Sequence, residues 1–175
     1  MPATEYFNIV DENGNPLGRI KERDQVHWDG DWHRTVHVWI ENGRGDVLIQ
    51  KRAPGKFTWP GKWDVSCAGH IPSGKSSRQT AIDEAREELG LTISPLELRY
   101  LGTAKDSFSD GNKYDNEIID IFVIQRDITP DDCILEIDEV SEVRSIPLNE
   151  LYRYVQTKNA DYVPHRKEYD MLFSY

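Results

Sequence analysis

The sequence predicts an α/β fold, a single domain in which a mixed sheet carries helices on its faces. Runs rich in β-branched and aromatic residues stand both before and after one well-marked helical segment. Asn13-Gly14 and Asn42-Gly43 are turn signals, and the second separates two strand-like runs as in a hairpin. With 175 residues, 38% hydrophobic and 30% charged, the chain is long enough to bury one core.

Four strands are expected in the first half of the chain, at residues 6–10, 35–41, 46–52 and 63–68. The middle two flank the Asn42-Gly43 turn, so we expect them to pair as a hairpin. Residues 21–34 are polar and aromatic, and we predict a loop with little regular structure there.

A helix is predicted to begin after Ser76, because Ser76 and Gln79 have the spacing of a capping box. Its apolar face would consist of Ala81, Ile82, Ala85 and Leu89. Gly90 suits the left-handed position that ends many helices. Further strands are expected at about 97–105, 117–126 and 141–146, with helices near 148–157 and 162–173.

The composition of the chain indicates which binding partners and which cellular compartment to expect. The formal net charge of −10 argues against binding of a nucleic acid polymer. No apolar run approaches the ~20 residues of a membrane span, and the first six residues lack the features of a signal peptide. Cys67 and Cys133 give no disulfide framework and no metal-binding spacing, so we expect a cytoplasmic protein. The sequence leaves the oligomeric state open.

Glu84, Glu87 and Glu88 carry the strongest chemical signal. Spacings of three and four residues place their carboxylates on one face of the predicted helix. Like-charged pairs at this spacing repel by roughly 0.2–0.5 kcal/mol unless a cation lies among them. Mg²⁺ prefers oxygen ligands and commonly completes its shell with substrate phosphates. Taken alone, the three acids are more typical of a solvated helix face than of a metal site.

The segment Gly69–Leu91 resembles the Nudix box, a glycine loop followed by a glutamate-rich helix. The matching positions are Gly69, Glu84, Ala85, Glu87, Glu88, Gly90 and Leu91. Lys75 stands where the family has glutamate, and Asp83 stands where it has arginine. Both signs are reversed together, so we predict that the two form the family's loop-to-helix ion pair with opposite polarity.

The resemblance implies a Nudix-type α/β/α sandwich in one domain, residues 1–175. Its core would be residues 34–155, preceded by a strand and loop extension (1–33) and followed by a tail (156–175). These boundaries are expectations that follow from the resemblance.

The same resemblance implies a Mg²⁺-dependent enzyme, with Mn²⁺ as an alternative metal. Glu84, Glu87 and Glu88 would be catalytic and metal-binding, and the carbonyl of Gly69 would be a further ligand. In the family, either a glutamate of the box or one from a distant loop acts as general base. Glu117 is a candidate for that distant position, as a catalytic or metal-binding residue, because relatives place a glutamate beside the box helix.

Asp115 and Glu117 open a strong strand, and residues two apart on a strand point to the same face. Solvated loop acids are the alternative interpretation of this pair. The segment from His27 to Trp39 is similar to the entry segment of isopentenyl-diphosphate isomerases. By that similarity, His27, His33, His70 and Asp115, together with Glu117, would be ligands of a second metal. Histidines with purely structural hydrogen bonds are the other interpretation.

The isomerase reaction needs a cysteine two residues before the box-loop histidine, and Ala68 occupies that position. Cys67 is one residue earlier, and a one-residue shift on a strand turns a side chain to the opposite face. We therefore predict that Cys67 is a buried apolar residue.

The function predicted from the sequence is Mg²⁺-dependent hydrolysis of a diphosphate linkage in a small molecule, a nucleoside di- or triphosphate derivative. Five aromatic residues are candidates either for stacking on a nucleobase or for core packing: Trp59, Trp63, Tyr100, Phe108 and Tyr114. Two other functions remain as alternatives. One is an isopentenyl-diphosphate isomerase-like activity, which Ala68 disfavours, and the other is a non-catalytic ligand-binding module on the same fold.

Overall fold

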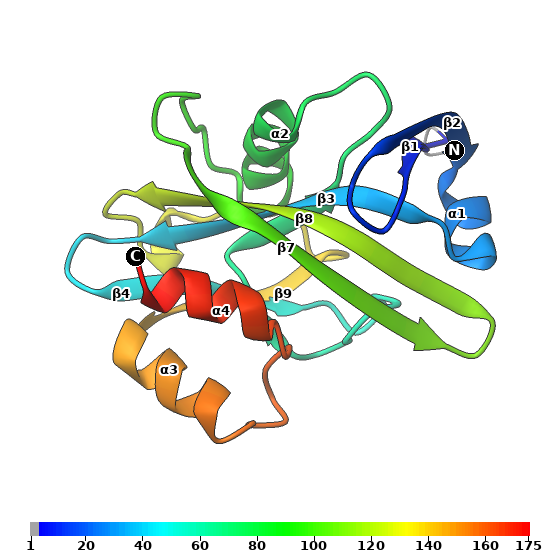
Figure 1. Cartoon of the computed structure of the whole chain (residues 1–175). Helices are drawn as coiled ribbons and strands as arrows, with labels where there is room; N and C mark the ends of the chain where they lie inside the picture. Colours follow the sequence, from blue (N-terminus) through cyan, green and yellow to red (C-terminus); the bar gives the residue numbers. More distant parts are fainter. Residues whose placement is uncertain (1–3) are drawn as a thin grey trace.

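The computed structural model describes residues 4–175, which form helices around one nine-stranded mixed sheet (Figure 1). The strands are β1 (Tyr6–Val10), β2 (Pro16–Glu22), β3 (Trp32–Glu41), β4 (Asp46–Arg52), β5 (Trp63–Asp64), β6 (Cys67–His70), β7 (Arg99–Asp110), β8 (Lys113–Gln125) and β9 (Val140–Pro147). The helices are α1 (Arg23–Asp29), α2 (Ser77–Leu89), α3 (Leu148–Gln156) and α4 (Arg166–Phe173), with a 3₁₀ turn, η1 (Pro130–Asp132).

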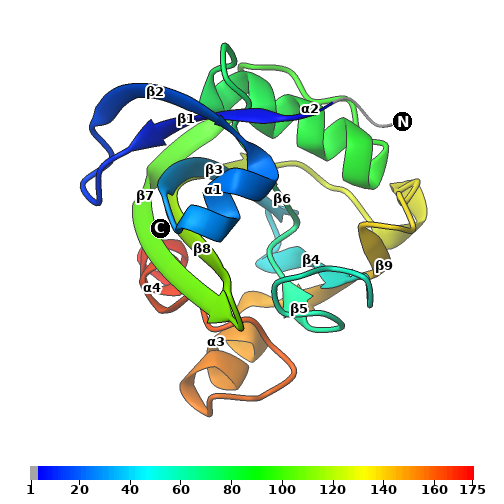
Figure 2. The same cartoon turned by 90° about the vertical axis from the view of Figure 1, so that its right-hand side faces the viewer.

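The helices lie in two layers, with α2 on one side of the sheet and α3 and α4 on the other (Figures 1 and 2). Successive side chains of β3 point to opposite faces of the sheet, so each helix layer covers its own part of the core. Val38 belongs to the apolar cluster under α2, and Trp39 belongs to the cluster on the opposite face. The predicted α/β/α sandwich with a mixed sheet is confirmed.

β3 organises the sheet because its two edges are used differently. One edge pairs with β8, in parallel, along the whole strand. The other edge is shared by β1, β6 and β4, and the β3–β4 hairpin, which was predicted, keeps only two residue pairs, Ile40 with Leu48 and Glu41 with Val47. β4 continues with β5 and β9 instead. The sheet therefore divides into two parts that diverge from this hairpin.

Local sequence accounts for the ends of α2. The Ser76 hydroxyl accepts a hydrogen bond from the backbone N–H of Gln79 at 3.2 Å, whereas the Gln79 side chain donates to Asp83 at 3.1 Å. Half of the predicted capping box is therefore present. Gly90 ends the helix with φ of 70°, a left-handed conformation that suits glycine.

The prediction of a loop at 21–34 is wrong. β2 extends to Glu22, α1 follows directly, and β3 begins at Trp32. α1 has only seven residues, and Val26 and His27 are its buried side chains, so it shows no repeating apolar pattern. The first three residues of the predicted extension 1–33 lie outside the described residues.

In the second half of the chain the predicted strands and helices are present, but two of the strands are longer than predicted. β7 and β8 continue to Asp110 and Lys113, where they meet in a tight antiparallel hairpin.

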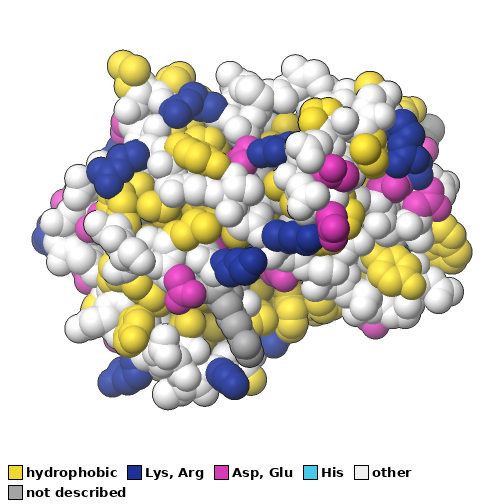
Figure 3. Space-filling view, in the orientation of Figure 1, with side chains coloured by type: hydrophobic (Ala, Val, Ile, Leu, Met, Phe, Trp, Pro, Cys, Tyr) yellow, Lys and Arg dark blue, Asp and Glu magenta, His cyan; other side chains and the backbone are white. Residues whose placement is uncertain are grey.

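Among residues 4–175, no helix combines the length and hydropathy needed to cross a bilayer. On the face shown in Figure 3, lysines and arginines are scattered among acidic and apolar side chains.

Candidate active site and metal-binding residues

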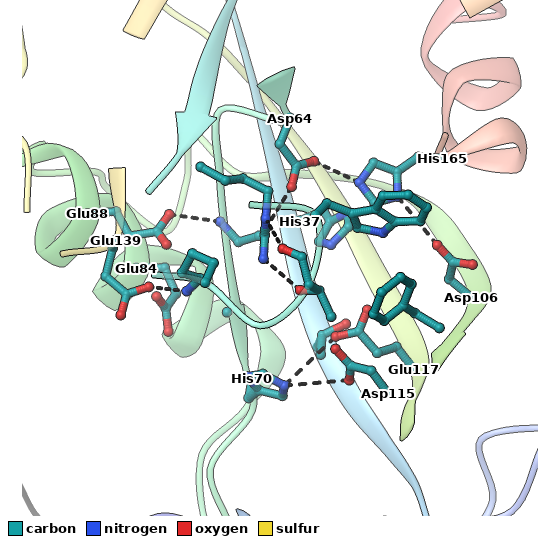
Figure 4. A pocket seen from close by; sticks show the side chains of 18 of the residues that line it. His37, Asp64, His70, Glu84, Glu88, Asp106, Asp115, Glu117, Glu139 and His165 are labelled. Atoms are coloured by element: carbon teal, nitrogen blue, oxygen red, sulfur yellow. Dashed lines mark hydrogen bonds and ion pairs between the residues drawn. The ribbon is translucent and has the colours of Figure 1, made fainter. Parts of the chain in front are cut away.

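A cavity of about 460 Å³ is lined by both parts of the divided sheet and by α2 (Figure 4). Of the predicted site residues, Gly69, His70, Glu84, Glu87, Glu88, Asp115 and Glu117 line it. His27 and His33 are not in the lining but contact Asp115, at 3.4 and 3.5 Å. The fold therefore gathers the whole predicted set in one region.

Glu88 is the most buried of the three helix glutamates. Its Oε2 accepts hydrogen bonds from the backbone N–H of Ala68 at 3.1 Å and from the Gln50 side chain at 3.3 Å. Burial raises the pKa of Glu88 to about 7, although the Ala68 N–H acts in the opposite direction. The carboxylate is thus held in place but is costly to ionise without a cation.

Glu84 lies directly over Gly69. A Cβ atom at position 69 would come within 2.1 Å of the Glu84 carboxylate carbon, so only glycine fits beneath this side chain. Burial, followed by the charges of Glu88 and Glu87, raises the pKa of Glu84 to about 8. Glu87 is different, because it lies at the rim with its side chain 60% exposed and pairs with Arg86 at 3.1 Å.

Lys75 and Asp83 join the glycine loop to α2. The Lys75 ammonium lies 2.7 Å from Asp83 Oδ2, and the pair lowers the pKa of Asp83 and raises that of Lys75. The predicted ion pair with opposite polarity is confirmed.

His27, His33, His70 and Asp115 form a second group. One ligand atom from each lies within 4.8 Å of all the others. The Nε2 atoms of the three histidines and Asp115 Oδ1 are buried, and none has a hydrogen-bond partner among the described residues. Buried polar atoms of native proteins are rarely left unpaired, so four that converge on one point fit a bound cation.

The surroundings of these histidines favour metal binding. His33 Nδ1 lies 3.2 Å from the carbonyl oxygen of Asp31, so Nδ1–H donates there and Nε2 is the nitrogen that faces the other members of the group. Phe7 stacks on His70 with ring centroids 4.9 Å apart. Burial, together with His33, lowers the pKa of His70 to about 3, which keeps the ring neutral.

Asp115 and Glu117 differ in charge although both point into this region. Burial opposes ionisation of Asp115, yet the three histidines hold its pKa below the usual value. Burial and the neighbouring Asp115 raise the pKa of Glu117, which lies 3.9 Å from His70 Nε2. A cation here would relieve the repulsion between the two carboxylates.

The cavity also contains residues to which the sequence assigned no role. His165 Nε2 lies 2.7 Å from Asp64 Oδ1, and Arg52 pairs with the other oxygen of Asp64 at 2.8 Å. His37 lies 2.7 Å from Glu168. Each partner is about 100 residues or more away in the sequence from its histidine, so no local pattern could have revealed these pairs.

Cys67 and Ala68 point to opposite faces, as predicted. Cys67 is fully buried in the core under α2, and Ala68 lines the cavity. Of the five candidate aromatic residues, Trp59 and Phe108 line the cavity, with ring centroids 4.9 Å apart. Trp63 belongs to the core on the α4 side of the sheet, and Tyr100 and Tyr114 are exposed.

A family model described as the NUDIX domain matches residues 31–169. The chain belongs to the Nudix family. It is 35% identical to Nudix hydrolase 3 of Arabidopsis thaliana over 98% of its own length, although it spans only 23% of that longer protein. It is 37% identical to an uncharacterized Nudix hydrolase of Clostridium acetobutylicum, over 88% of this chain and 75% of the relative.

A solved structure from Deinococcus radiodurans has the same fold, with a TM-score of 0.71 and 22% identity, covering 97% of this chain and 98% of that one. The family match and these relatives make the chain an enzyme of the Nudix hydrolase type.

Proposed function

We propose that this Nudix enzyme hydrolyses a diphosphate linkage in a nucleoside di- or triphosphate derivative, with Mg²⁺ as its metal and Mn²⁺ as an alternative. The observation that carries the proposal is the buried carboxylate of Glu88 and the partly buried carboxylate of Glu84, which share one cavity with Asp115 and Glu117. Such a concentration of acids in a poorly solvated site is unfavourable unless a cation balances it.

Glu84, Glu88 and Glu117 would hold the catalytic cation together with the carbonyl of Gly69, and Glu87 would contribute from the rim. When bound, the cation neutralises phosphate oxygens and makes the phosphorus more open to attack by water. The chain supplies carboxylates that are already positioned, Glu88 by the Ala68 N–H and Glu84 by the space above Gly69. The side chains need little rearrangement on binding, which favours catalysis.

His27, His33, His70 and Asp115 would hold a second divalent cation. Their converging atoms without hydrogen-bond partners support this assignment. The neutral imidazole of His70 and the ionised Asp115 are in the protonation states that a metal requires.

The proposed substrate class is supported by the shape of the cavity and by proteins of the same fold. Trp59 and Phe108 offer apolar ring surface at the cavity wall for a planar base. The Nudix domain of Shewanella oneidensis NrtR, which shares the fold with a TM-score of 0.58, was crystallised with ADP ribose.

Cys67 and Cys133 are both free thiols, which supports a reducing compartment such as the cytoplasm.

The test is a product-release screen over nucleotides, nucleotide sugars, dinucleoside polyphosphates and prenyl diphosphates, with Mg²⁺ or Mn²⁺. We expect turnover that EDTA abolishes, and a loss of kcat by orders of magnitude in Glu88→Gln while the variant stays folded. Glu142→Gln is the matched control, because Glu142 is exposed on β9 and outside the cavity lining. Near-normal turnover by Glu88→Gln would refute the assignment.

Two other functions compete with this one. Isopentenyl-diphosphate isomerases are among the relatives; one from Photorhabdus laumondii is 34% identical over 72% of this chain. Ala68 offers no proton to an alkene, however, and the thiol of Cys67 lies in the core on the opposite face. Incubation with isopentenyl diphosphate and Mg²⁺ decides between the two. Absence of turnover on every compound would favour a non-catalytic binding module.

A further inference from the structure

His37, on β3, has the geometry of an oriented proton acceptor. Its Nδ1 lies 2.7 Å from Glu168 Oε2, and the other oxygen of Glu168 accepts a hydrogen bond from the Trp39 indole at 2.7 Å. Glu168 is 1% exposed, so its position is fixed. A carboxylate can only accept, so Nδ1 of His37 carries a hydrogen that points to Glu168, and Nε2 is the ring nitrogen not used in this contact.

His37 lines the same cavity as the glutamates of the box. It pairs across the sheet with Ala68, whose backbone N–H is bonded to Glu88. Directly opposed side chains of neighbouring strands are roughly 4.5–5.5 Å apart at Cβ. Because Ala68 carries only a methyl group, little side chain separates the imidazole from the cavity. Figure 4 shows His37 between the carboxylates of α2 and the group formed by Asp64, Asp106 and His165.

The charged groups that face His37 from neighbouring elements are already engaged. Asp64, on β5, is paired with both Arg52 and His165. Asp106, on β7, lies 3.6 Å from the second nitrogen of His165. Asp64 and Asp106 are weak bases in this setting, because the neighbouring cations hold their pKa values below the usual range against the effect of burial.

Among the described residues of the cavity wall, His37 therefore combines a ring nitrogen not used in its contact with Glu168 and a fixed carboxylate partner. Glu84, Glu88 and Glu117 are assigned to the cation, and a carboxylate bound to a cation has little affinity for a proton. The site still needs an acceptor for the proton that the attacking water gives up.

We propose that His37 is a further catalytic residue, the general base that deprotonates the attacking water, and that Glu168 is its positioning residue. An O–H bond of the water breaks as the bond from Nε2 to that proton forms. The water oxygen bonds to phosphorus while the bridging P–O bond breaks and the leaving phosphate takes the electron pair. Glu168 keeps the Nδ1 hydrogen bond throughout and offsets the charge of the imidazolium. This inference rests on the proposed diphosphatase function.

The kinetic test compares His37→Gln and Glu168→Gln with the wild type on the best substrate of the screen. The amide of Glu168→Gln presents an N–H group to Nδ1, which moves the ring hydrogen to Nε2 and removes the acceptor. We expect kcat to fall roughly 10²–10⁴-fold in both variants, with KM changed less than about threefold. Asp170→Asn is the matched control, an acid-to-amide change on an exposed position of α4.

The spectroscopic test needs no turnover. In ¹⁵N-histidine spectra of the wild type, we expect His37 to carry its hydrogen on Nδ1 and its Nε2 signal to shift when Mg²⁺ and imidodiphosphate are added. Normal kcat in folded His37→Gln overturns the inference while leaving the diphosphatase function intact. If the wild type shows no turnover, the diphosphatase function is rejected, and the spectra then test only the orientation of the His37 ring. A hydrogen on Nε2 of His37 would overturn that orientation.

Discussion

Glu84 and Glu88 are the residues on which the cation proposal depends, because their environment opposes their own ionisation. Their folded-state pKa values of about 8 and about 7 exceed the ordinary carboxyl value of 4.5. The folded protein therefore holds protons that the unfolded chain has already lost. Proton binding of this kind makes stability depend on pH.

Without metal, the free energy of unfolding should decrease as the pH rises from 6.5 to 8. The folded state binds more protons than the unfolded state in this window, so the derivative of stability with pH is negative. The raised pKa values of Glu117 and His165 act with the same sign, and the lowered pKa of His70 opposes them mainly near and below pH 6.5. Thermal unfolding in EDTA would measure the slope. Mg²⁺ should stabilise more at pH 8 than at pH 6, because it competes with the protons.

The double variant Glu84→Gln/Glu88→Gln is the control for this prediction. Amides do not titrate, so the decline between pH 6.5 and 8 should become shallower. An unchanged slope in the double variant would place the responsible groups elsewhere in the molecule.

Gly69→Ala should weaken Mg²⁺ binding with little effect on folding. The new methyl group would occupy the position of the Glu84 carboxylate, 2.1 Å from its carbon, and the flexible side chain would move away. Misplacing a ligand in this way typically costs roughly 10–100-fold in metal affinity. Titration calorimetry with Mg²⁺ measures the change. Gly55→Ala is the control, because a Cβ there meets no atom within 4 Å and no positive φ is involved; equal affinities in the two variants would contradict the prediction.

At the scale of elements, the brace between the glycine loop and α2 can be tested by exchanging its charges. Lys75→Glu and Asp83→Arg should each destabilise the protein, and the double variant should recover part of the loss. The expected coupling free energy is about 0.5–1 kcal/mol, since Lys75 is 45% exposed. Urea unfolding of the four proteins gives this coupling directly. Additive effects of the two changes would show that the pair contributes nothing.

Elements with a strong local pattern could be predicted from the sequence. α2 has an apolar stripe, a serine at its start and Gly90 at its end, and β8 has an apolar run from Ile118. α1 could not be predicted, because seven residues make barely two turns and leave no periodicity to detect. The polar ends of β7 and β8 were missed for a related reason, since cross-strand pairing rather than composition makes them strands.

The residues of the candidate site also fall into two groups, those that the sequence could predict and those that it could not. Glu84 and Glu88 stand at fixed spacings within one segment, so their proximity follows from helix geometry. His165 lines the cavity and Glu168 contacts His37 only because α4 packs on the face of the sheet that carries His37. Neither residue lies in a recognisable motif, and their role depends on contacts between distant parts of the chain.

At the scale of the whole molecule, the histidine group connects four elements. His27 comes from α1, His33 from β3, His70 from β6 and Asp115 from β8. A cation bound to all four would join the N-terminal part to the centre of the sheet. Ligand binding to the folded state alone stabilises a protein by about 2.7 kcal/mol at a hundred times Kd.

Mn²⁺ at about a hundred times its Kd should therefore raise the Tm of the wild type by roughly 5–10 °C. His33→Gln should lose most of this increase, because His33 is fully buried at the centre of the group. Glu88→Gln should keep the part that the histidine group provides. Differential scanning calorimetry with the chloride salt alone is sufficient. A Tm increase of equal size in His33→Gln and the wild type would exclude a cation among the histidines.

The inverted brace has a consequence for how relatives of this enzyme are found. A motif search that insists on glutamate at position 75 and arginine at position 83 would reject this chain, although the three glutamates of the box helix, Glu84, Glu87 and Glu88, are kept. In this chain Lys75 and Asp83 keep the contact between loop and helix with the two signs exchanged. Searches that allow either order should recover family members that a fixed signature discards.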